Sequence, residues 1–230
     1  MTQNDGESTR PMAPRRMPTG VPGLDQVLQG GLLEGASCLV LGRPGTGKTT
    51  LGNQMAFHYA REGNALFVTV LAEAHDRMLM HLANFDFFRP ELVGEQVHYF
   101  SIVHPLAEEG LDAALTELRR LVQTYRARLV VIDGTARFED FATSRAAYRR
   151  FVYTMVAQLA EFGCTTLLLA QPNGDSDTVE GIGTLVDGIL QLDDQSVGRH
   201  DVRLLRVQKL RGSAPVRGQH EFAITDAGIE

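Results

Sequence analysis

The chain has only two cysteines among its 230 residues, Cys38 and Cys164, and each lies within an apolar stretch. Neither has a partner at the spacing of a metal site, and two isolated thiols exclude the disulfide framework of a small secreted domain. We therefore expect both cysteines to be reduced side chains in the core of a cytoplasmic protein.

The sequence also lacks long apolar runs and an excess of positive charge. Its apolar runs are far shorter than the ~18 residues that span a bilayer, so we expect no membrane segment. The pair Arg15-Arg16 is not followed by the apolar region of a twin-arginine signal. The net charge of −6 excludes the strongly basic footprint of many duplex-binding proteins but leaves a local basic patch open.

What the chain does have is an ordinary globular composition with extra glycine. Apolar residues make up 43 % and charged residues 22 %, which supports a sizeable core and excludes a mostly disordered or collagen-like chain. The 23 glycines exceed the average share of about 7 % and indicate tight turns where the backbone approaches another group.

The order of patterns along the chain predicts an α/β fold. Residues 1–16 are polar, contain Pro11 and Pro14, and are expected to form a disordered tail before one domain at 17–230. Short apolar runs predict strands at 37–41, 65–70, 97–102, 128–132 and 164–170. Apolar residues at helical spacing predict core-facing helices that begin near Leu51, Leu111 and Tyr148.

This alternation favours a mainly parallel sheet flanked by helices. Three later stretches resemble strands but have no helices between them, and they predict a C-terminal antiparallel extension at 187–193, 201–209 and 219–225.

A phosphate-binding loop follows the first predicted strand. The sequence from Gly42 to Thr49 reads G-R-P-G-T-G-K-T and fits the pattern G-x-x-x-x-G-K-[ST] in full. Glycines let N–H groups surround phosphate oxygens at a helix N-terminus, Lys48 can reach the β- and γ-phosphates, and Thr49 can bind Mg²⁺. We predict that the loop binds ATP through Gly42, Pro44, Gly45, Thr46, Gly47, Lys48, Thr49 and Thr50.

Three further polar residues follow predicted strands and would lie at the same edge of a parallel sheet. Asp133 ends an apolar run and is predicted to hold Mg²⁺ with Thr49, although such a residue is also a common turn former. Glu73 is the candidate that activates water, with a solvated helix-terminal glutamate as the alternative. His75 is more simply a surface or capping residue. Gln171 either bonds the γ-phosphate or the water, or is a plain turn residue.

Lys209 and Arg211 form the last candidate group. They are two residues apart, so on a strand both side chains point to one face. Two cations on one face could clamp phosphate charge in the manner of an arginine finger. The simpler interpretation is a solvated basic strand edge.

Both ends of the domain resemble a known family. The stretch T-G-V-P-G-L-D at 19–25, with the glycines that follow it, resembles the entry signature of RecA-superfamily ATPases. The stretches K-L-R-G-S at 209–213 and F-A-I-T-D-A-G-I at 222–229 are similar to the end of a KaiC domain. The resemblance covers residues 17–230 and implies a RecA-like P-loop NTPase fold.

KaiC-like domains bind ATP between neighbouring subunits of a ring, usually a hexamer. The resemblance therefore implies that this chain binds ATP and Mg²⁺, assembles with itself, and hydrolyses ATP as a regulatory or signalling enzyme. It also implies that one set of residues reaches the nucleotide of the neighbouring copy: Lys209, Leu210, Arg211, Ser213, Thr225 and Asp226.

The chain departs from the KaiC pattern at several positions. Ala72 stands where the family has the first of two adjacent glutamates, with Glu73 as the second, so we expect slow hydrolysis. The Ser-Thr pair that the clock protein phosphorylates falls on Gly183-Thr184, so autokinase activity is not expected. Gly134 replaces a frequent serine. Because the family often carries two tandem domains, residues 17–230 could be the first of such a pair.

Two other functions remain open from the sequence. A DNA-dependent recombination ATPase would share the fold, but the KaiC-like tail, the negative net charge and the acidic stretch 174–183 disfavour it. A nucleotide-gated scaffold would bind ATP with little turnover. We expect self-association and unidentified protein partners, and neither nucleic acid nor membrane as a partner.

Overall fold

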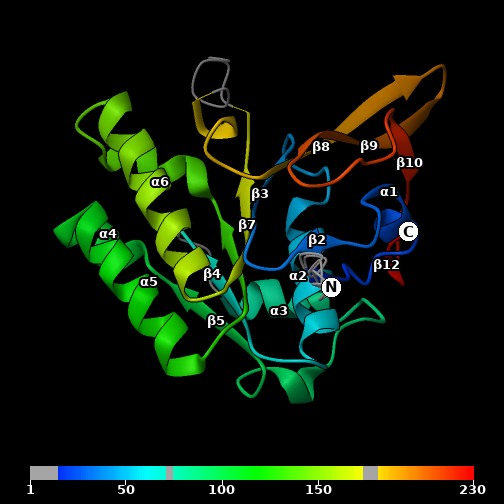
Figure 1. Ribbon diagram of the computed structural model, residues 1–230. Coiled ribbons are helices and arrows are strands. Elements are labelled where there is room, and N and C mark those ends of the chain that lie inside the picture. Colours follow the sequence, from blue (N-terminus) through cyan, green and yellow to red (C-terminus); the bar gives the residue numbers. More distant parts are fainter. Residues whose placement is uncertain (1–14, 71–74, 173–180) are drawn as a thin grey trace, which may run out of the picture.

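The computed structural model in Figure 1 describes residues 15–70, 75–172 and 181–230. At its centre is an eight-stranded sheet in the order β10 (His220–Phe222), β9 (His200–Leu210), β8 (Gly188–Val197), β3 (Ser37–Leu41), β7 (Thr165–Ala170), β6 (Leu129–Asp133), β4 (Ala65–Thr69) and β5 (Val97–Ser101). The strands from β8 to β5 are parallel, whereas β9 and β10 are antiparallel to their neighbours.

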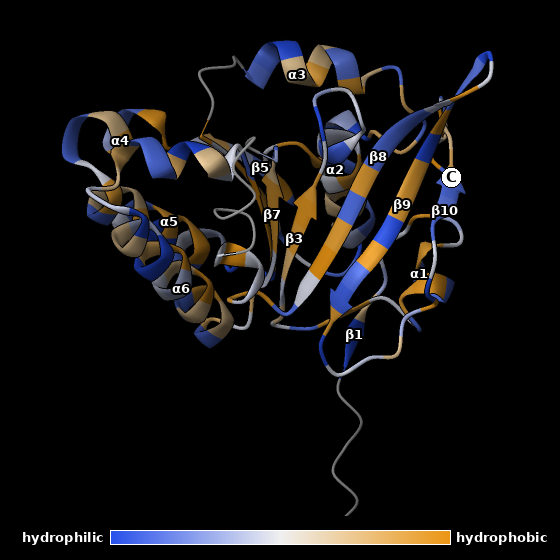
Figure 2. Ribbon diagram, turned by 90° about the horizontal axis from the view of Figure 1, so that it is seen from above, coloured by the Kyte–Doolittle hydropathy of each residue, from blue (hydrophilic) through white to orange (hydrophobic). Residues whose placement is uncertain are grey.

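Helices cover both faces of the sheet (Figure 1 and Figure 2). One layer contains α4 (Val103–Glu109), α5 (Leu111–Tyr125) and α6 (Arg145–Glu161), and the other contains α1 (Leu24–Val27), α2 (Lys48–Tyr59) and α3 (His75–Leu82). Successive residues of β3 alternate between two apolar cores. Leu39 and Leu41 pack in the core under α5 and α6, whereas Cys38 and Val40 pack in the core under α2. Burial on both faces explains why the strands read as nearly continuous apolar runs.

The α/β fold class predicted from the sequence is confirmed. β3 has the predicted bounds, and the other predicted strands of the parallel sheet differ by one residue at one or both ends. The three predicted helical stripes lie in α2, α5 and α6. The predicted antiparallel extension is present: β8 is parallel to β3, and β9 and β10 then follow it in antiparallel order. β8 and β9 are longer than predicted because they continue as a hairpin beyond the sheet.

Several short elements were not predicted from the sequence. They are β1 (Arg16–Met17), which pairs with β2 (Leu32–Leu33), β12 (Gly228–Ile229), and the 3-10 helices η1 (Pro90–Leu92) and η2 (Thr135–Phe141). β11 (Ile224–Thr225) pairs with β12, and the predicted stretch 219–225 is divided between β10 and β11. β1 begins inside the predicted tail because the Arg16 guanidinium donates to Leu28 O, Gly31 O and Ser213 Oγ. Residues 1–14 of that tail lie outside the described residues. In the three described ranges, no helix is both long and apolar enough to cross a membrane.

Strand direction gives the sheet two chemically different edges. β3, β6 and β7 all end at one edge, which we call the carboxyl edge. β9 ends at the opposite, amino edge, because Leu210 pairs with Gly188 at the start of β8, and Gly188 pairs with Cys38 near the start of β3. Residues that follow β3 and residues that follow β9 are therefore on opposite sides of the molecule.

Candidate functional site

The predicted phosphate loop joins the end of β3 to the start of α2. Gly45 and Gly47 have φ angles of 83° and 96°, in the left-handed region where other side chains are strained. Gly42 is needed for a different reason, because an added Cβ would lie only 2.9 Å from Leu192 O. The loop and the first turn of α2 bring together all the residues predicted to bind nucleotide here: Gly42, Pro44, Gly45, Thr46, Gly47, Lys48, Thr49 and Thr50.

Lys48 bends back over this loop. Its Nζ donates to Gly42 O and Arg43 O, each at 2.8 Å. Burial lowers the pKa of Lys48, and the negative charge of Asp133 opposes that shift. The loop therefore holds an ammonium group against its own carbonyl oxygens, where phosphate oxygens would be stronger partners for the same charge.

Thr49 and Asp133 are in direct contact. Thr49 Oγ1 donates to Asp133 Oδ2 at 2.7 Å, so the structure brings together two predicted metal ligands that are 84 residues apart. Hydroxyl and carboxylate oxygens fit Mg²⁺, which usually keeps several waters and needs few protein ligands. The described part of the chain contains no cluster of three or more His, Cys, Asp or Glu residues able to hold a metal.

Gln171 follows β7 and is exposed at the carboxyl edge, between the ends of β3 and β6. The predicted water-activating residue, Glu73, lies outside the described residues. His75 begins α3, and its ring centroid lies 6.1 Å from that of Tyr99. The ring of His75 is partly buried, and its Nε2 has no hydrogen-bond partner among the described residues.

Lys209 and Arg211 lie at the amino edge, and both contact the turn 183–187 that precedes β8. Lys209 Nζ donates to two carbonyl oxygens of this turn, Val186 O at 2.6 Å and Gly183 O at 2.9 Å. Burial lowers the pKa of Lys209, and the neighbouring positive charge of Arg211 lowers it further. The two predicted cations are thus side by side, but they are not beside the phosphate loop of their own chain.

The distance between the two groups follows from the strand register. Ser37 begins β3 at the amino edge, and Gly42 follows β3 at the carboxyl edge. The five residue steps between them correspond to about 16 Å at about 3.3 Å per residue. Because Lys209 and Arg211 also bind the turn at the amino edge, neither can contact a phosphate held by its own loop.

A groove of about 730 Å³ lies beside Lys209. Leu210 and Ser213, from the same predicted group, line it, and Arg206 and Arg217 add positive charge. Arg206 pairs with Gln191, which pairs with Leu41 at the end of β3, so the groove extends from the amino edge along β9 toward the carboxyl edge. Its polar, cationic lining is suited to an anionic ligand.

Thr225 and Asp226 do not lie in this group, which corrects the expectation that all six residues face one neighbouring nucleotide. Thr225 ends β11, Asp226 begins the turn between β11 and β12, and Asp226 O accepts from Asp86 N at 2.7 Å. The adjacent Ile224 packs on the chain's own phosphate loop, since a Cβ on Gly47 would lie 2.7 Å from Ile224 Cδ1. The cause is β10, which runs antiparallel to β9 and returns the chain to the carboxyl edge.

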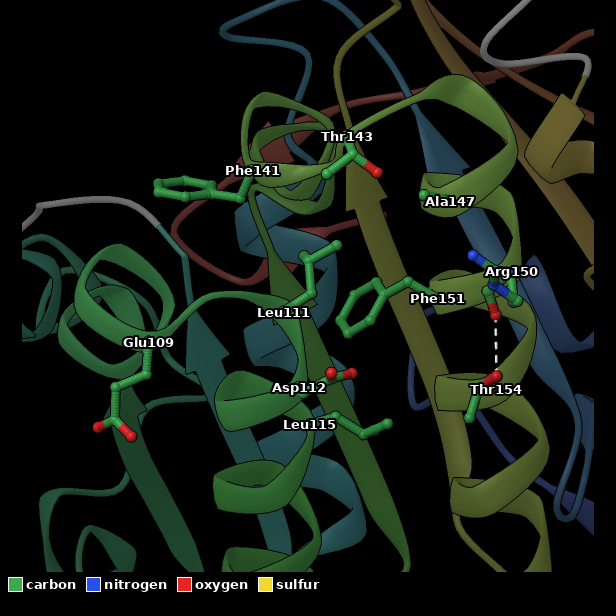
Figure 3. A pocket seen from close by; sticks show the side chains of 10 residues that line it. All are labelled: Glu109, Leu111, Asp112, Leu115, Phe141, Thr143, Ala147, Arg150, Phe151 and Thr154. Atoms are coloured by element: carbon green, nitrogen blue, oxygen red, sulfur yellow. Dashed lines mark hydrogen bonds between the residues drawn. The ribbon is translucent and has the colours of Figure 1, made fainter.

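A separate hollow of about 360 Å³ lies between α5, η2 and α6 (Figure 3). Leu115, Phe141 and Phe151 form its apolar wall, and Asp112 and Arg150 bring opposite charges to it. None of the residues predicted to bind nucleotide lines this hollow, so it is distinct from the nucleotide site.

Asp187 is a candidate that sequence reasoning missed. Its Oδ2 accepts from Ser37 N and Ser37 Oγ, both at 3.0 Å, and its Oδ1 lies 3.5 Å from Arg211 Nη1. The only sequence signal was an acid just before a predicted strand, which cannot be told from a turn residue.

Comparisons with known proteins show the family to which the chain belongs. A family model described as "ATPase: KaiC" matches residues 17–230. A UPF0273 protein of Methanopyrus kandleri is 30 % identical, over 95 % of this chain and 92 % of that protein. The circadian clock oscillator protein KaiC of Synechococcus elongatus is 30 % identical over 93 % of this chain, which corresponds to 43 % of that longer protein.

Solved structures show the same likeness. The crystal structure of a KaiC-like protein from Pyrococcus horikoshii matches this fold with a TM-score of 0.80 at 26 % identity. The match covers 94 % of this chain and 98 % of that one.

Proposed function

The chain belongs to the KaiC family of ATPases, and from that premise we propose that it hydrolyses ATP with Mg²⁺ at sites shared between neighbouring copies of itself. The proposed assembly is a homo-oligomeric ring, with six copies as the expected number. The proposed role is regulatory or signalling, in the cytoplasm, with protein partners rather than nucleic acid or membrane.

The observation that carries the shared site is the separation of two cationic groups by the sheet. Lys48 lies at the carboxyl edge, whereas the Lys209 and Arg211 side chains are bound to the turn at the amino edge, and β3 separates the two edges by about 16 Å. A phosphate held by one chain can meet both groups only if a second copy presents its amino edge. The groove beside Lys209 supports this arrangement, because it offers positive charge and open space.

In the proposed site, the loop amides and Lys48 of one copy bind the phosphates of ATP. Thr49 and Asp133 hold Mg²⁺, which neutralises charge on the phosphate oxygens. Gln171 and Glu73 orient the attacking water from the same chain. Lys209 and Arg211 of the neighbouring copy stabilise the charge that develops on the transferred phosphoryl group.

The four other residues predicted to contact nucleotide fall into two pairs, one for the neighbour's nucleotide and one for the chain's own. Leu210 and Ser213 line the groove at the amino edge and would meet the neighbour's nucleotide. Thr225 and Asp226 lie near their own loop and would contact the nucleotide bound by their own chain. Ala72 in place of the first family glutamate favours slow turnover, and we propose no autokinase activity.

Mixing two variants of low residual activity tests the shared site. Lys48→Ala removes the phosphate contact of one copy but leaves its amino edge intact, and Arg211→Ala does the reverse. In a ring assembled at random from equal amounts, about one quarter of the interfaces pair an intact loop with an intact arginine. We expect the mixture to recover about a quarter of the wild-type rate, and no recovery would refute the shared site.

Other functions predict different results. Strong stimulation of ATP hydrolysis by single-stranded DNA would favour a recombination ATPase instead. ATP binding without measurable turnover, in a wild-type protein that Glu73→Gln does not slow further, would favour a nucleotide-gated scaffold. Sizing with and without ATP and Mg²⁺ tests the ring directly.

A further inference from the structure

We propose that Asp187 is a positioning residue that orients Arg211 toward the nucleotide of the neighbouring copy. The inference rests on the shared site proposed above. It concerns how one chain prepares its amino edge before a neighbour presents a phosphate there.

Asp187 is fixed to the sheet more firmly than an ordinary surface acid. Its Oδ2 accepts two hydrogen bonds from Ser37, from the backbone N and from Oγ, each at 3.0 Å. Its backbone N also donates to Ser37 O at 2.9 Å. The carboxylate is therefore part of the framework at the start of β3, and only Oδ1 is left to face the cations.

Both terminal nitrogens of the Arg211 guanidinium contact the turn that contains Asp187. Nη1 lies 3.5 Å from Asp187 Oδ1, and Nη2 donates to Thr184 O at 3.1 Å. The backbone N of Arg211 donates to Asp187 O at 2.8 Å. A planar guanidinium with two fixed contacts has its direction set, whereas a free arginine on a turn samples many rotamers.

The same turn also holds Lys209, through Val186 O and Gly183 O. These partners are neutral carbonyls, so Asp187 is the group in the turn that pairs by charge with Arg211. Ordering the arginine in advance reduces the entropy lost when it meets the transition state. The expected consequence is an effect on kcat rather than on ATP affinity, because the loop that binds ATP belongs to the other copy.

Asp187→Asn keeps an acceptor for Ser37 and removes the charge that faces Arg211. We expect kcat to fall about threefold to tenfold, since partly exposed ion pairs contribute modestly, with KM for ATP unchanged within about twofold. The matched control is Ser37→Ala, which removes one hydrogen bond to the same carboxylate but leaves its charge in place. We expect the control to retain the wild-type kcat.

Two readouts separate positioning from a structural defect. In a double-mutant cycle, Asp187→Asn should have no further effect on kcat in the Arg211→Ala background, because it acts through that arginine. The second readout is ATP hydrolysis by rings mixed from equal amounts of Asp187→Asn and Lys48→Ala. If the kcat of Asp187→Asn is about a tenth of wild type, the mixture should hydrolyse ATP about fivefold faster than the summed rates of the two proteins assayed separately. If Asp187→Asn instead distorted the phosphate loop of its own chain through β3, mixing with Lys48→Ala would not restore activity.

The outcomes distinguish this inference from the shared site itself. Suppose that mixing with Lys48→Ala restores the activity of Arg211→Ala, so that the shared site stands. The role of Asp187 is then refuted by any of three results: Asp187→Asn keeps the wild-type kcat, its loss of kcat adds to that of Arg211→Ala, or mixing with Lys48→Ala does not restore its activity. If Arg211→Ala is not rescued either, the shared site fails. Should Asp187→Asn not fold, Asp187→Ser takes its place, because it also removes the charge, and either an unchanged kcat or a loss that adds to Arg211→Ala overturns the proposal.

Discussion

A buried polar contact beside the phosphate loop allows a quantitative test of how the first turn of α2 is held. Tyr99 Oη donates to Asn53 Oδ1 at 2.7 Å, and Asn53 Nδ2 donates to Thr49 O at 2.8 Å. Asn53 is 0 % exposed, and the tyrosine hydroxyl is the hydrogen-bond donor to its Oδ1. The contact links β5 to the turn that carries Thr49.

Tyr99→Phe deletes the donor and leaves the Asn53 carbonyl oxygen buried and unpaired. Such an orphaned group costs about 1–3 kcal/mol of unfolding free energy. For a chain of this size, each 1 kcal/mol lowers Tm by about 2–4 °C. The double variant Tyr99→Phe/Asn53→Leu removes both polar partners, so we expect it to regain most of the lost stability.

Thermal unfolding followed by circular dichroism without nucleotide measures both variants. Tyr153→Phe is the matched control, because Tyr153 is 59 % exposed and its loss should leave Tm unchanged. An unchanged Tm for Tyr99→Phe would show that the hydrogen bond contributes nothing. A double variant that melts as low as the single variant would show that the lost stability does not come from an unpaired buried oxygen.

Three further predictions concern pH, the loop and the metal site. Burial raises the pKa of Cys164 from 9.0 to about 11, so the folded state keeps a proton that the unfolded state releases, and stability should fall as the pH rises from 9 through 11. Cys164→Ala should make that fall shallower in urea titrations with reductant, and an unchanged slope would contradict the cause. Gly47→Ala should weaken ATP binding and lower Tm, because it adds backbone strain of about 1–2 kcal/mol and crowds Ile224. Gly94→Ala, at a φ of 85° but with nothing within 4 Å, should lower Tm through strain alone and leave ATP binding intact. Asp133→Asn should raise the Mg²⁺ concentration needed for half-maximal ATP hydrolysis by about tenfold or more, and an unchanged requirement would argue against its role as a metal ligand.

The parallel half of the fold could be predicted from the sequence because its signals are local. Each strand is an apolar run buried on both faces, as the five buried residues of β3 show. The phosphate loop has a fixed spacing, and its preceding strand and following helix are both in place. The contact between Thr49 and Asp133 was also predictable, because the ends of parallel strands meet at one edge.

The amino edge could not be predicted in the same way, because its contacts depend on register. Asp187 meets Ser37 across 150 residues, and no spacing in the sequence announces that pair. Thr225 and Asp226 follow Lys209 closely in the chain, yet β10 carries them to the other edge of the sheet. Sequence proximity suggested one group where the structure has two.

The separation of these two edges makes a prediction about how activity depends on protein concentration, which the motif residues alone do not make. A contact between the carboxyl edge of one copy and the amino edge of the next uses two different surfaces, so it repeats from copy to copy and gives either a closed ring or an open filament. If each nucleotide site needs both edges, the rate per chain must fall when dilution breaks that contact, even though every chain keeps an intact loop. A site complete within one chain would keep its rate at any dilution. The antiparallel return of β9, which places Lys209 and Arg211 away from their own loop, therefore determines whether hydrolysis depends on assembly.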